Sequence, residues 1–254
     1  MIVMVVGRPF RVVFASGVAV LALAGCGADV EGAPVERREF AFDGEALVVD
    51  ADDSDLVITA ADVDGVRVER QVDGWVFMGS GPEASWKLVD GRLTLRVGCD
   101  AVAASCGGVH RIQVPRGVAV TVEDDDGDIT AEGFATPLKV RTDDGDVRVR
   151  EVGGEVDVVS KDGDVSVEGS VGSPSVVVRS DDGDVKVTLA AVPRKVDVVT
   201  KDGDVAVAVP KGEYEASGVS DDGDVRMDVP LRAGSGHVVR LRSDDGDLRL
   251  RTVN

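Results

Sequence analysis

The chain has 254 residues and carries 28 basic against 47 acidic side chains, a formal net charge of −19. A surface this negative repels phosphate backbones, which argues against nucleic acid as a partner and favours cations or cationic surfaces. The chain has two histidines and no His-rich metal motif, nucleophile elbow, P-loop or dinucleotide-binding fingerprint. The sequence predicts no particular oligomeric state.

The first 25 residues have the features of a lipoprotein signal peptide. Arg8 and Arg11 give a positively charged n-region, and an apolar run from Val12 to Ala24 follows. The run has the length of a signal-peptide core and is short for a bilayer span. The run ends in Leu-Ala-Gly-Cys at residues 23–26, which resembles the bacterial lipobox, where the chain is cut before the cysteine and the cysteine carries the lipid. We therefore expect an exported protein that is lipid-anchored at the outer face of the cell membrane through Cys26. An ordinary secretory signal and a single-pass anchor are the alternatives.

Cleavage before Cys26 leaves 26 basic and 47 acidic side chains, a net charge of −21. Residues 26–38 are expected to form a tether, residues 39–115 an N-terminal β region with a disulfide loop, and residues 116–254 a β-repeat region. Cys99 and Cys106 are the remaining cysteines. An even pair in an exported chain predicts a disulfide that closes a small loop.

Seven copies of Asp-Gly-Asp recur at intervals of 18 to 23 residues in the second half of the chain. Their glycines are Gly127, Gly145, Gly163, Gly183, Gly203, Gly223 and Gly246. On both sides of each copy, apolar residues, mostly valine, alternate with polar ones, which is typical of β-strands with one buried face. Each copy is therefore predicted to join two strands by a tight turn, whose glycine supplies a positive φ.

Two arrangements of these strands fit the pattern: a solenoid in which successive copies stack, or an antiparallel meander or sandwich in which each turn is a hairpin. The residues two before the glycines alternate in sign over five copies: Asp143, Lys161, Asp181, Lys201 and Asp221. In a solenoid, equivalent side chains lie about 4.8 Å apart, so opposite charges become neighbours. We therefore predict an all-β fold, a solenoid-like stack of two-strand coils with an irregular N-terminal β cap.

The first half of the chain contains weaker signals of the same kind. Residues 53–55, Asp-Ser-Asp, form a degenerate copy with serine in the place of glycine, and Asp90-Gly91 is a hairpin candidate between two apolar strands. Trp75, Phe77 and Trp86 fall in this region. It is therefore expected to cap the stack, because terminal units of solenoids are atypical.

Aspartates flank the glycine of every copy. The first row, before the glycine, comprises Asp126, Asp144, Asp162, Asp182, Asp202, Asp222 and Asp245; the second row, after it, comprises Asp128, Asp146, Asp164, Asp184, Asp204, Asp224 and Asp247. Stacked one strand apart, each like-charged pair costs about 1 kcal/mol in a water-like dielectric and several times more near a protein surface. Hydrogen bonds from turn amides can offset this repulsion. Alternatively, both rows of the first six turns bind divalent cations, above all Ca²⁺, between adjacent coils. No other cofactor is expected.

Paired carboxylates can hydrolyse glycosides, but here they are so regular that none is singled out. Ser235 and His237 lie among glycines in a loop, where a lone histidine is more often a plain loop residue than a base. We therefore predict no catalytic residues, and a carbohydrate-active enzyme is the alternative from another class.

The lipobox, the Val-Pro-Arg-Gly-Val segment at residues 114–118 and the recurrent [Ser/Thr]-x-Asp-Gly-Asp-Val units resemble the bacterial putative-adhesin family of β-strand-repeat envelope proteins, a domain of unknown function. The resemblance covers about residues 39–254 and implies a β-solenoid-like body and a role in the cell envelope. The family pattern needs only the glycine and the aspartate that follows it, so the invariant first-row aspartate exceeds it. These features predict a non-enzymatic, adhesin-like surface scaffold or interaction module with an envelope or extracellular partner. A Ca²⁺-binding or Ca²⁺-stabilised envelope protein is the alternative.

Overall fold

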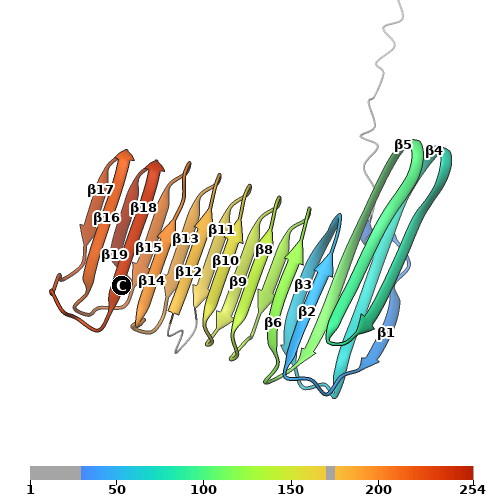
Figure 1. Cartoon of the computed structure of the whole chain (residues 1–254), viewed down its shortest axis with the longest axis horizontal. Helices are drawn as coiled ribbons and strands as arrows, with labels where there is room; N and C mark the ends of the chain where they lie inside the picture. Colours follow the sequence, from blue (N-terminus) through green and yellow to red (C-terminus); the bar gives the residue numbers. More distant parts are fainter. Residues whose placement is uncertain (1–29, 170–174, 254) are drawn as a thin grey trace, which may run out of the picture.

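The computed structural model describes residues 30–169 and 175–253 as an all-β stack (Figure 1). Apart from one short 3-10 turn, η1 (Val30–Gly32), every element in these ranges is a strand. None of the described segments is a helix with the length and apolarity needed to cross a membrane. The signal peptide and Cys26 lie outside the described residues.

Each Asp-Gly-Asp turn joins a strand of one layer to a strand of the other. The first layer holds β6 (Ala119–Asp124), β8 (Leu138–Thr142), β10 (Val156–Ser160), β12 (Ser175–Ser180), β14 (Lys195–Val199), β16 (Glu215–Asp222) and β18 (Val238–Asp245). The second layer holds β7 (Ile129–Glu132), β9 (Val147–Val152), β11 (Val165–Gly169), β13 (Val185–Leu189), β15 (Val205–Val209), β17 (Val225–Asp228) and β19 (Leu248–Thr252).

Strands pair in parallel between coils, in register with their equivalents. β8 pairs with β6 on one side and β10 on the other, which places Val140 beside Val158. β9 likewise pairs with β7 and β11, which places Val149 beside Val167. In a meander, strands joined by a turn would pair antiparallel with each other. The predicted solenoid-like fold is therefore confirmed, with one coil per Asp-Gly-Asp copy.

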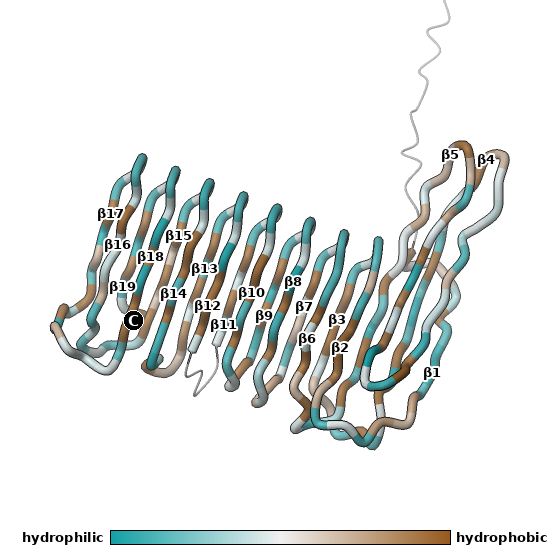
Figure 2. The backbone as a smooth tube through the Cα atoms, in the orientation of Figure 1, coloured by the Kyte–Doolittle hydropathy of each residue, from teal (hydrophilic) through white to brown (hydrophobic). Residues whose placement is uncertain are grey.

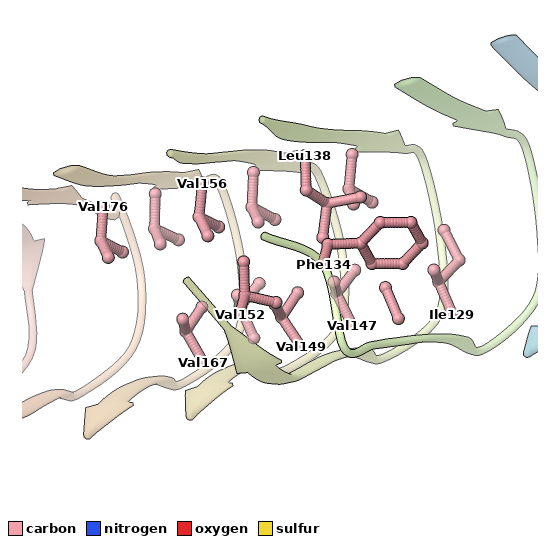
Figure 3. Close-up of a cluster of buried hydrophobic side chains, with 14 of the residues drawn as sticks. Ile129, Phe134, Leu138, Val147, Val149, Val152, Val156, Val167 and Val176 are labelled. Carbon is pink, nitrogen blue, oxygen red and sulfur yellow. The ribbon is translucent and has the colours of Figure 1, made fainter. Parts of the chain in front are cut away.

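The core is a single continuous cluster of apolar side chains between the two layers. Val140, Val149, Val158 and Val167 are completely buried, and Figure 3 shows buried side chains of the two layers pointing toward one another around Phe134. Burial of one such side chain contributes about 1.5–3 kcal/mol relative to exposure. The outward residues between them are polar or charged, which explains the period-two pattern of the sequence.

The N-terminal region continues the stack. Its strands are β1 (Glu36–Ala41), β2 (Ala46–Ala51), β3 (Ser54–Ala61), β4 (Gly65–Val89) and β5 (Arg92–Pro115). β2 and β3 form a coil directly before β6 and β7, with residues 53–55 as its turn. β5 forms a further complete coil, since its start pairs with β2 and its residues 108–115 pair with β3.

β4 runs antiparallel to β5, and the two are joined by Asp90 and Gly91 with φ values of 49° and 75°. Two successive positive φ values are those of a type I′ hairpin turn, which agrees with the expected hairpin. β4 thus makes the outermost coil, and β1 pairs with its first half only. β1 begins at Glu36, so the last three residues of the expected 26–38 tether belong to the fold. Ion pairs hold them there: Arg37 with Glu69 and Arg70 with Glu36, both at 2.6 Å.

The last two coils are not stacked in chain order. β14 pairs with β18, not with the β16 that follows it, and β16 then pairs with the other side of β18. The same exchange holds in the second layer, where β15 pairs with β19 and β19 with β17. The final coil of the chain, β18–β19, therefore lies between the β14–β15 coil and the β16–β17 coil. Lys201 consequently has Asp244 as its neighbour, and the Asp244 N–H donates a hydrogen bond to Lys201 O at 3.1 Å. The sequence analysis had set Lys201 beside Asp221, which is wrong for this reason.

Candidate functional site

The Asp-Gly-Asp turns lie side by side along one edge of the stack, here called the aspartate edge, and form a row of hydrophilic tips (Figure 2). Gly145 and Gly183 have φ values of 96° and 113°, which disfavour any residue with a side chain. A Cβ at Gly145 would also overlap the carbonyl oxygen of Gly127 in the adjacent coil. Adjacent turns therefore pack backbone against backbone, and this contact sets the spacing of their aspartates.

The second-row aspartates bind the backbone of the adjacent coil. Asp128 Oδ1 accepts a hydrogen bond from the N–H of Asp146 at 3.0 Å. The same bond, with N···O distances of 2.8–3.0 Å, begins at Asp55 Oδ1 in the degenerate turn and recurs along the edge, its donors being the amides of Asp128, Asp146, Asp164, Asp184, Asp204, Asp247 and Asp224. Hydrogen bonds to a charged acceptor are about twice as strong as neutral ones. The turn-amide explanation thus holds for this row, except that the amide belongs to the adjacent coil.

Basic side chains neutralise part of the edge. Arg148 bridges two second-row carboxylates, Asp128 at 2.9 Å and Asp146 at 2.6 Å. Lys201 contacts Asp181 of the adjacent coil at 2.8 Å, and Lys161 makes the equivalent contact with Asp143. These two pairs are the opposite-charge neighbours that the sign alternation predicted.

The first-row carboxylates keep their mutual repulsion. Partial burial, followed by the charges of Asp144 and Asp182 on either side, raises the pKa of Asp162. Burial and the charges of Asp182 and Asp245 raise the pKa of Asp202 in the same way. The negative charge of this row is therefore concentrated, exposed and periodic.

A third row, of hydroxyl side chains, runs inside the edge. Thr142, Ser160, Ser180 and Thr200 are buried, and each donates a hydrogen bond of 2.7–3.0 Å to the carbonyl oxygen of the first-row aspartate two residues later. Each bond ties the end of a first-layer strand to the turn that follows it. They give the serine or threonine of the repeat unit a structural role that the sequence analysis did not assign.

Asp124 takes the place of the hydroxyl residue in the first full repeat, since it pairs in register with Thr142. It is 5% exposed, and neither of its carboxyl oxygens has a hydrogen-bond partner. Burial raises its pKa to about 8, and the charges of Asp125 and Asp52 add to the effect. The sequence analysis missed this residue, although the aligned Ser/Thr position contained the signal.

Asp124 lies under a surface groove of about 420 Å³ that is also lined by Asp50 and Glu123. Arg92 and Arg96 bind the Asp50 carboxylate at 2.6 Å. A raised carboxyl pKa beside a second carboxylate is a pattern found in acid–base catalysis. Here both oxygens of Asp124 are sealed from solvent, so a substrate in the groove has no access to them.

The twelve aspartates predicted as cation ligands lie in the first six turns of the two rows. Within the described ranges, no three His, Cys, Asp or Glu side chains converge to hold a metal ion. Except for Asp224, each second-row aspartate uses one carboxyl oxygen to accept an amide hydrogen bond, and the described first-row carboxylates make no bond of this kind. Binding of Ca²⁺ by the two rows stays a prediction. The first-row carboxylates have more oxygens available for a cation than the second-row ones.

The predicted cysteine pair lies in β5, at the same edge of the stack as the Asp-Gly-Asp turns but not in one of those turns (Figure 1). Cys99 and Cys106 form a disulfide, with 6.2 Å between their Cα atoms. Seven residues of straight strand would span about 23 Å. β5 therefore bends sharply between the two cysteines as it passes from one layer to the other.

Comparisons with known proteins agree with this architecture. The model of the Toastrack family, DUF4097, matches residues 101–251. The solved structure of a putative adhesin from Bacteroides fragilis is 15% identical over 87% of this chain and 97% of its own, with a TM-score of 0.53, and this likeness shows the fold alone. A putative adhesin from Parabacteroides distasonis is 13% identical over 87% of this chain and 98% of its own, with a TM-score of 0.49. No curated protein matches the chain.

Proposed function

This chain belongs to the Toastrack family, DUF4097, and from that membership we propose that it is a non-enzymatic module of the cell envelope, held to the membrane by a lipid on Cys26 and presenting the aspartate edge to a partner. The observation that carries the proposal is the unbroken second-row chain of hydrogen bonds from Asp55 to Asp224. It makes the edge rigid and repetitive, as a scaffold or adhesive surface requires. Asp124, whose carboxyl pKa is raised and which lies outside the two rows, has both oxygens sealed from solvent, which favours a binding surface over a glycoside hydrolase.

Two further points support a surface location. The solved relatives are named as putative adhesins or as a putative cell adhesion protein, a role exercised outside the cell. The lipobox-like sequence at residues 23–26 accounts for export and retention together. An acidic edge suits a partner with a complementary basic surface, because matched potentials speed encounter and select orientation.

The anchor is tested by membrane fractionation of cells that express Cys26→Ala. This variant should appear in the released fraction, while wild type stays with the membrane and gains the mass of a lipid on Cys26. A double variant, Cys99→Ala with Cys106→Ala, is the matched control, because it removes two cysteines without touching the anchor. Unchanged fractionation of Cys26→Ala would refute the anchor.

The partner is tested by pull-down from intact envelope with the wild-type chain as bait. A chain with Asp162→Asn and Asp202→Asn, two exposed first-row positions, should lose capture while it keeps its melting temperature. Capture that is unaffected by these changes would remove the aspartate edge from the proposed function.

A second candidate function, cation binding, is supported by the raised pKa values of Asp162 and Asp202, which show carboxylates close enough to repel one another. A divalent cation between them would relieve that repulsion. Thermal melts in Ca²⁺ and in EDTA should then differ for wild type and coincide for the Asp162→Asn, Asp202→Asn chain. Coincident curves for wild type would remove this candidate.

A further inference from the structure

The β4–β5 hairpin projects beyond the aspartate edge and differs from it in chemistry. The projecting part, here called the crest, lies midway along the two strands, away from the Asp90-Gly91 turn, and comprises residues 74–82 of β4 and 99–106 of β5. The crest stands above the neighbouring turns, and its colouring is apolar where theirs is hydrophilic (Figures 1 and 2). Large side chains are exposed on it: Trp75 by 43%, Phe77 by 58%, Met78 by 72% and Val102 by 79%.

These side chains come from two short, paired stretches of β4 and β5. Phe77 pairs with Ala103 and Gly79 with Ala101, so Met78 and Val102 lie opposite each other between those pairs. Trp75 lies two residues from Phe77, and strand residues two apart share a face. Exposed apolar groups of this kind are uncommon on soluble monomers and mark surfaces that bind something.

The crest is held in shape without a partner. The Cys99–Cys106 disulfide closes its base on the β5 side, and the pairing of β4 with β5 runs through the crest to Ser80 and Asp100 and resumes after an irregularity at Glu83 and Gly98. A preformed surface loses little conformational entropy when it binds. The exposed side chains therefore belong to an ordered, preformed surface and not to a loosely folded loop.

The charge of the crest selects the kind of partner. Among all residues of the crest, Asp100 is the only one with a charged side chain. The rest of the molecule, by contrast, carries a large excess of acid. A surface with a single charged side chain and an exposed tryptophan and phenylalanine suits the interface of a lipid bilayer, where tryptophan is enriched.

The first described residues, which follow the proposed lipid site at Cys26, lie at the same end of the stack as the crest. η1 packs against β4, and Gln71 Nε2 donates a hydrogen bond to Ala33 O at 3.1 Å. Gln71 is four residues from Trp75, which is about 13 Å along a strand. Cys26 is four residues before Val30, a segment that spans at most about 14 Å. A lipid on Cys26 would therefore lie within about 14 Å of Val30, at the end of the stack that carries the crest.

We propose that the crest inserts Trp75, Phe77, Met78 and Val102 into the interface of the bilayer that holds the lipid of Cys26. The proposal rests on the lipid anchor proposed above. The crest provides the second membrane contact that one lipid attachment usually requires for stable binding. It also fixes the orientation of the stack relative to the membrane, which a flexible lipid tether alone does not.

Tryptophan fluorescence of the lipidated full chain in vesicles of neutral phosphatidylcholine tests this insertion. The chain has two tryptophans, Trp75 and Trp86. In Trp86→Phe, the emission of Trp75 should shift to shorter wavelength on reconstitution and be quenched by brominated lipid. Trp75→Phe, which retains only Trp86, gives the signal to subtract from wild type if Trp86→Phe folds poorly. A reporter at Leu231, which is 62% exposed in the loop beyond β17, should remain unquenched in a Trp75→Phe, Trp86→Phe background.

A kinetic measurement complements the spectroscopic one. Replacement of Trp75, Phe77 and Met78 by serine should speed transfer of the lipidated chain between vesicles at least about tenfold, which corresponds to about 1.4 kcal/mol. Serine at Val225, Leu231 and Val219, which are exposed at the opposite end of the stack, should leave the transfer rate unchanged.

The outcomes separate the two proposals. A lipid mass on Cys26 with an unquenched Trp75 would overturn the crest contact and keep the anchor. Absence of lipid on Cys26 would overturn the anchor, and the crest contact with it. A blue shift of Trp75 that depends on protein concentration in detergent, without vesicles, would assign the crest to a second copy of the chain and overturn the membrane contact.

Discussion

Asp124 matches Thr142, Ser160 and their equivalents in position and differs from them in charge. The hydroxyl of Thr142 donates a hydrogen bond of 2.7 Å to the carbonyl of Asp144. An ionised carboxylate has no proton to donate, so it would be buried without a partner at this point, which is costly. With its pKa raised by burial to about 8, Asp124 keeps its proton at neutral pH and resembles the hydroxyl that it replaces.

Replacement of Asp124 by serine should therefore stabilise the protein in a pH-dependent way. The folded chain holds a proton on Asp124 that the unfolded chain releases above about pH 4, so this stabilisation is complete in acid and is lost as the pH rises through about 8. Asp124→Ser should raise the free energy of unfolding by about 2 kcal/mol at alkaline pH and by less in acid. Urea unfolding over a pH series measures this, with the exposed Asp126→Ser as control. Parallel wild-type and Asp124→Ser profiles would contradict it.

His110 produces the opposite pH dependence. It is fully buried with Nδ1 3.1 Å from Ser54 Oγ, and burial, aided by the charge of Arg70, lowers its pKa to about 4. On acidification the unfolded chain protonates His110 near pH 6.5, whereas the folded chain does so only near pH 4. The free energy of unfolding therefore keeps this contribution above pH 6.5 and loses it as the pH falls toward 4. In an Asp124→Ser background, stability should fall on acidification, and His110→Asn should flatten the fall. An acid limb that persists in His110→Asn would assign it to other groups.

At the scale of the turn, the two aspartates have different physical roles. Asp184 Oδ1 accepts the Asp204 amide at 2.8 Å, so it stabilises the contact between coils. Asp182, two residues earlier, raises the pKa values of Asp162 and Asp202 by repulsion. One turn thus contains a carboxylate that stabilises the contact between coils and one that repels its neighbours.

Alanine at these two positions should have unequal effects. Asp184→Ala leaves the Asp204 amide without its acceptor and should cost about 1–3 kcal/mol. Asp182→Ala relieves repulsion and should change stability by no more than about 0.5 kcal/mol, in either direction. Each variant serves as the control for the other in thermal unfolding. Equal losses would show that both rows are structural.

The repeats could be predicted because each coil contains all the local signals of its own structure. Alternation around Val147 and Val165 fixed the buried faces, and the sign change from Asp143 to Lys161 indicated stacking. The role of β5 as a coil could not be predicted, because its turn has no Asp-Gly-Asp and its pairing depends on contacts far along the chain. Asp124 was missed although the aligned repeats place it at the Ser/Thr position, because the sequence alone does not show that this position is buried.

At the scale of the molecule, the order of coils at the C-terminal end follows burial and not chain order. The inner coil, β18–β19, contributes Leu241, Leu248 and Leu250, all of them buried. The outer coil, β16–β17, has Gly218 at the position that pairs with Leu241, and its Val225 is 41% exposed. The coil with the larger apolar side chains, β18–β19, is thus covered by a coil on each side. The β16–β17 coil, which has fewer large apolar side chains to bury, forms the end of the stack.

This order can be tested by a pair of size-matched truncations. Val205 and Val225 are the partners of Leu248 on its two sides, at 1% and 41% exposure. Val205→Ala should cost about 2 kcal/mol and Val225→Ala less than about 1 kcal/mol, because a cavity forms only where the site is enclosed. Leu248→Ala should cost about 2–5 kcal/mol, the value for a leucine between two coils. If the coils instead stacked in chain order, Leu248 would lie at the open end, and urea unfolding would show a small loss for Leu248→Ala and a large one for Val225→Ala.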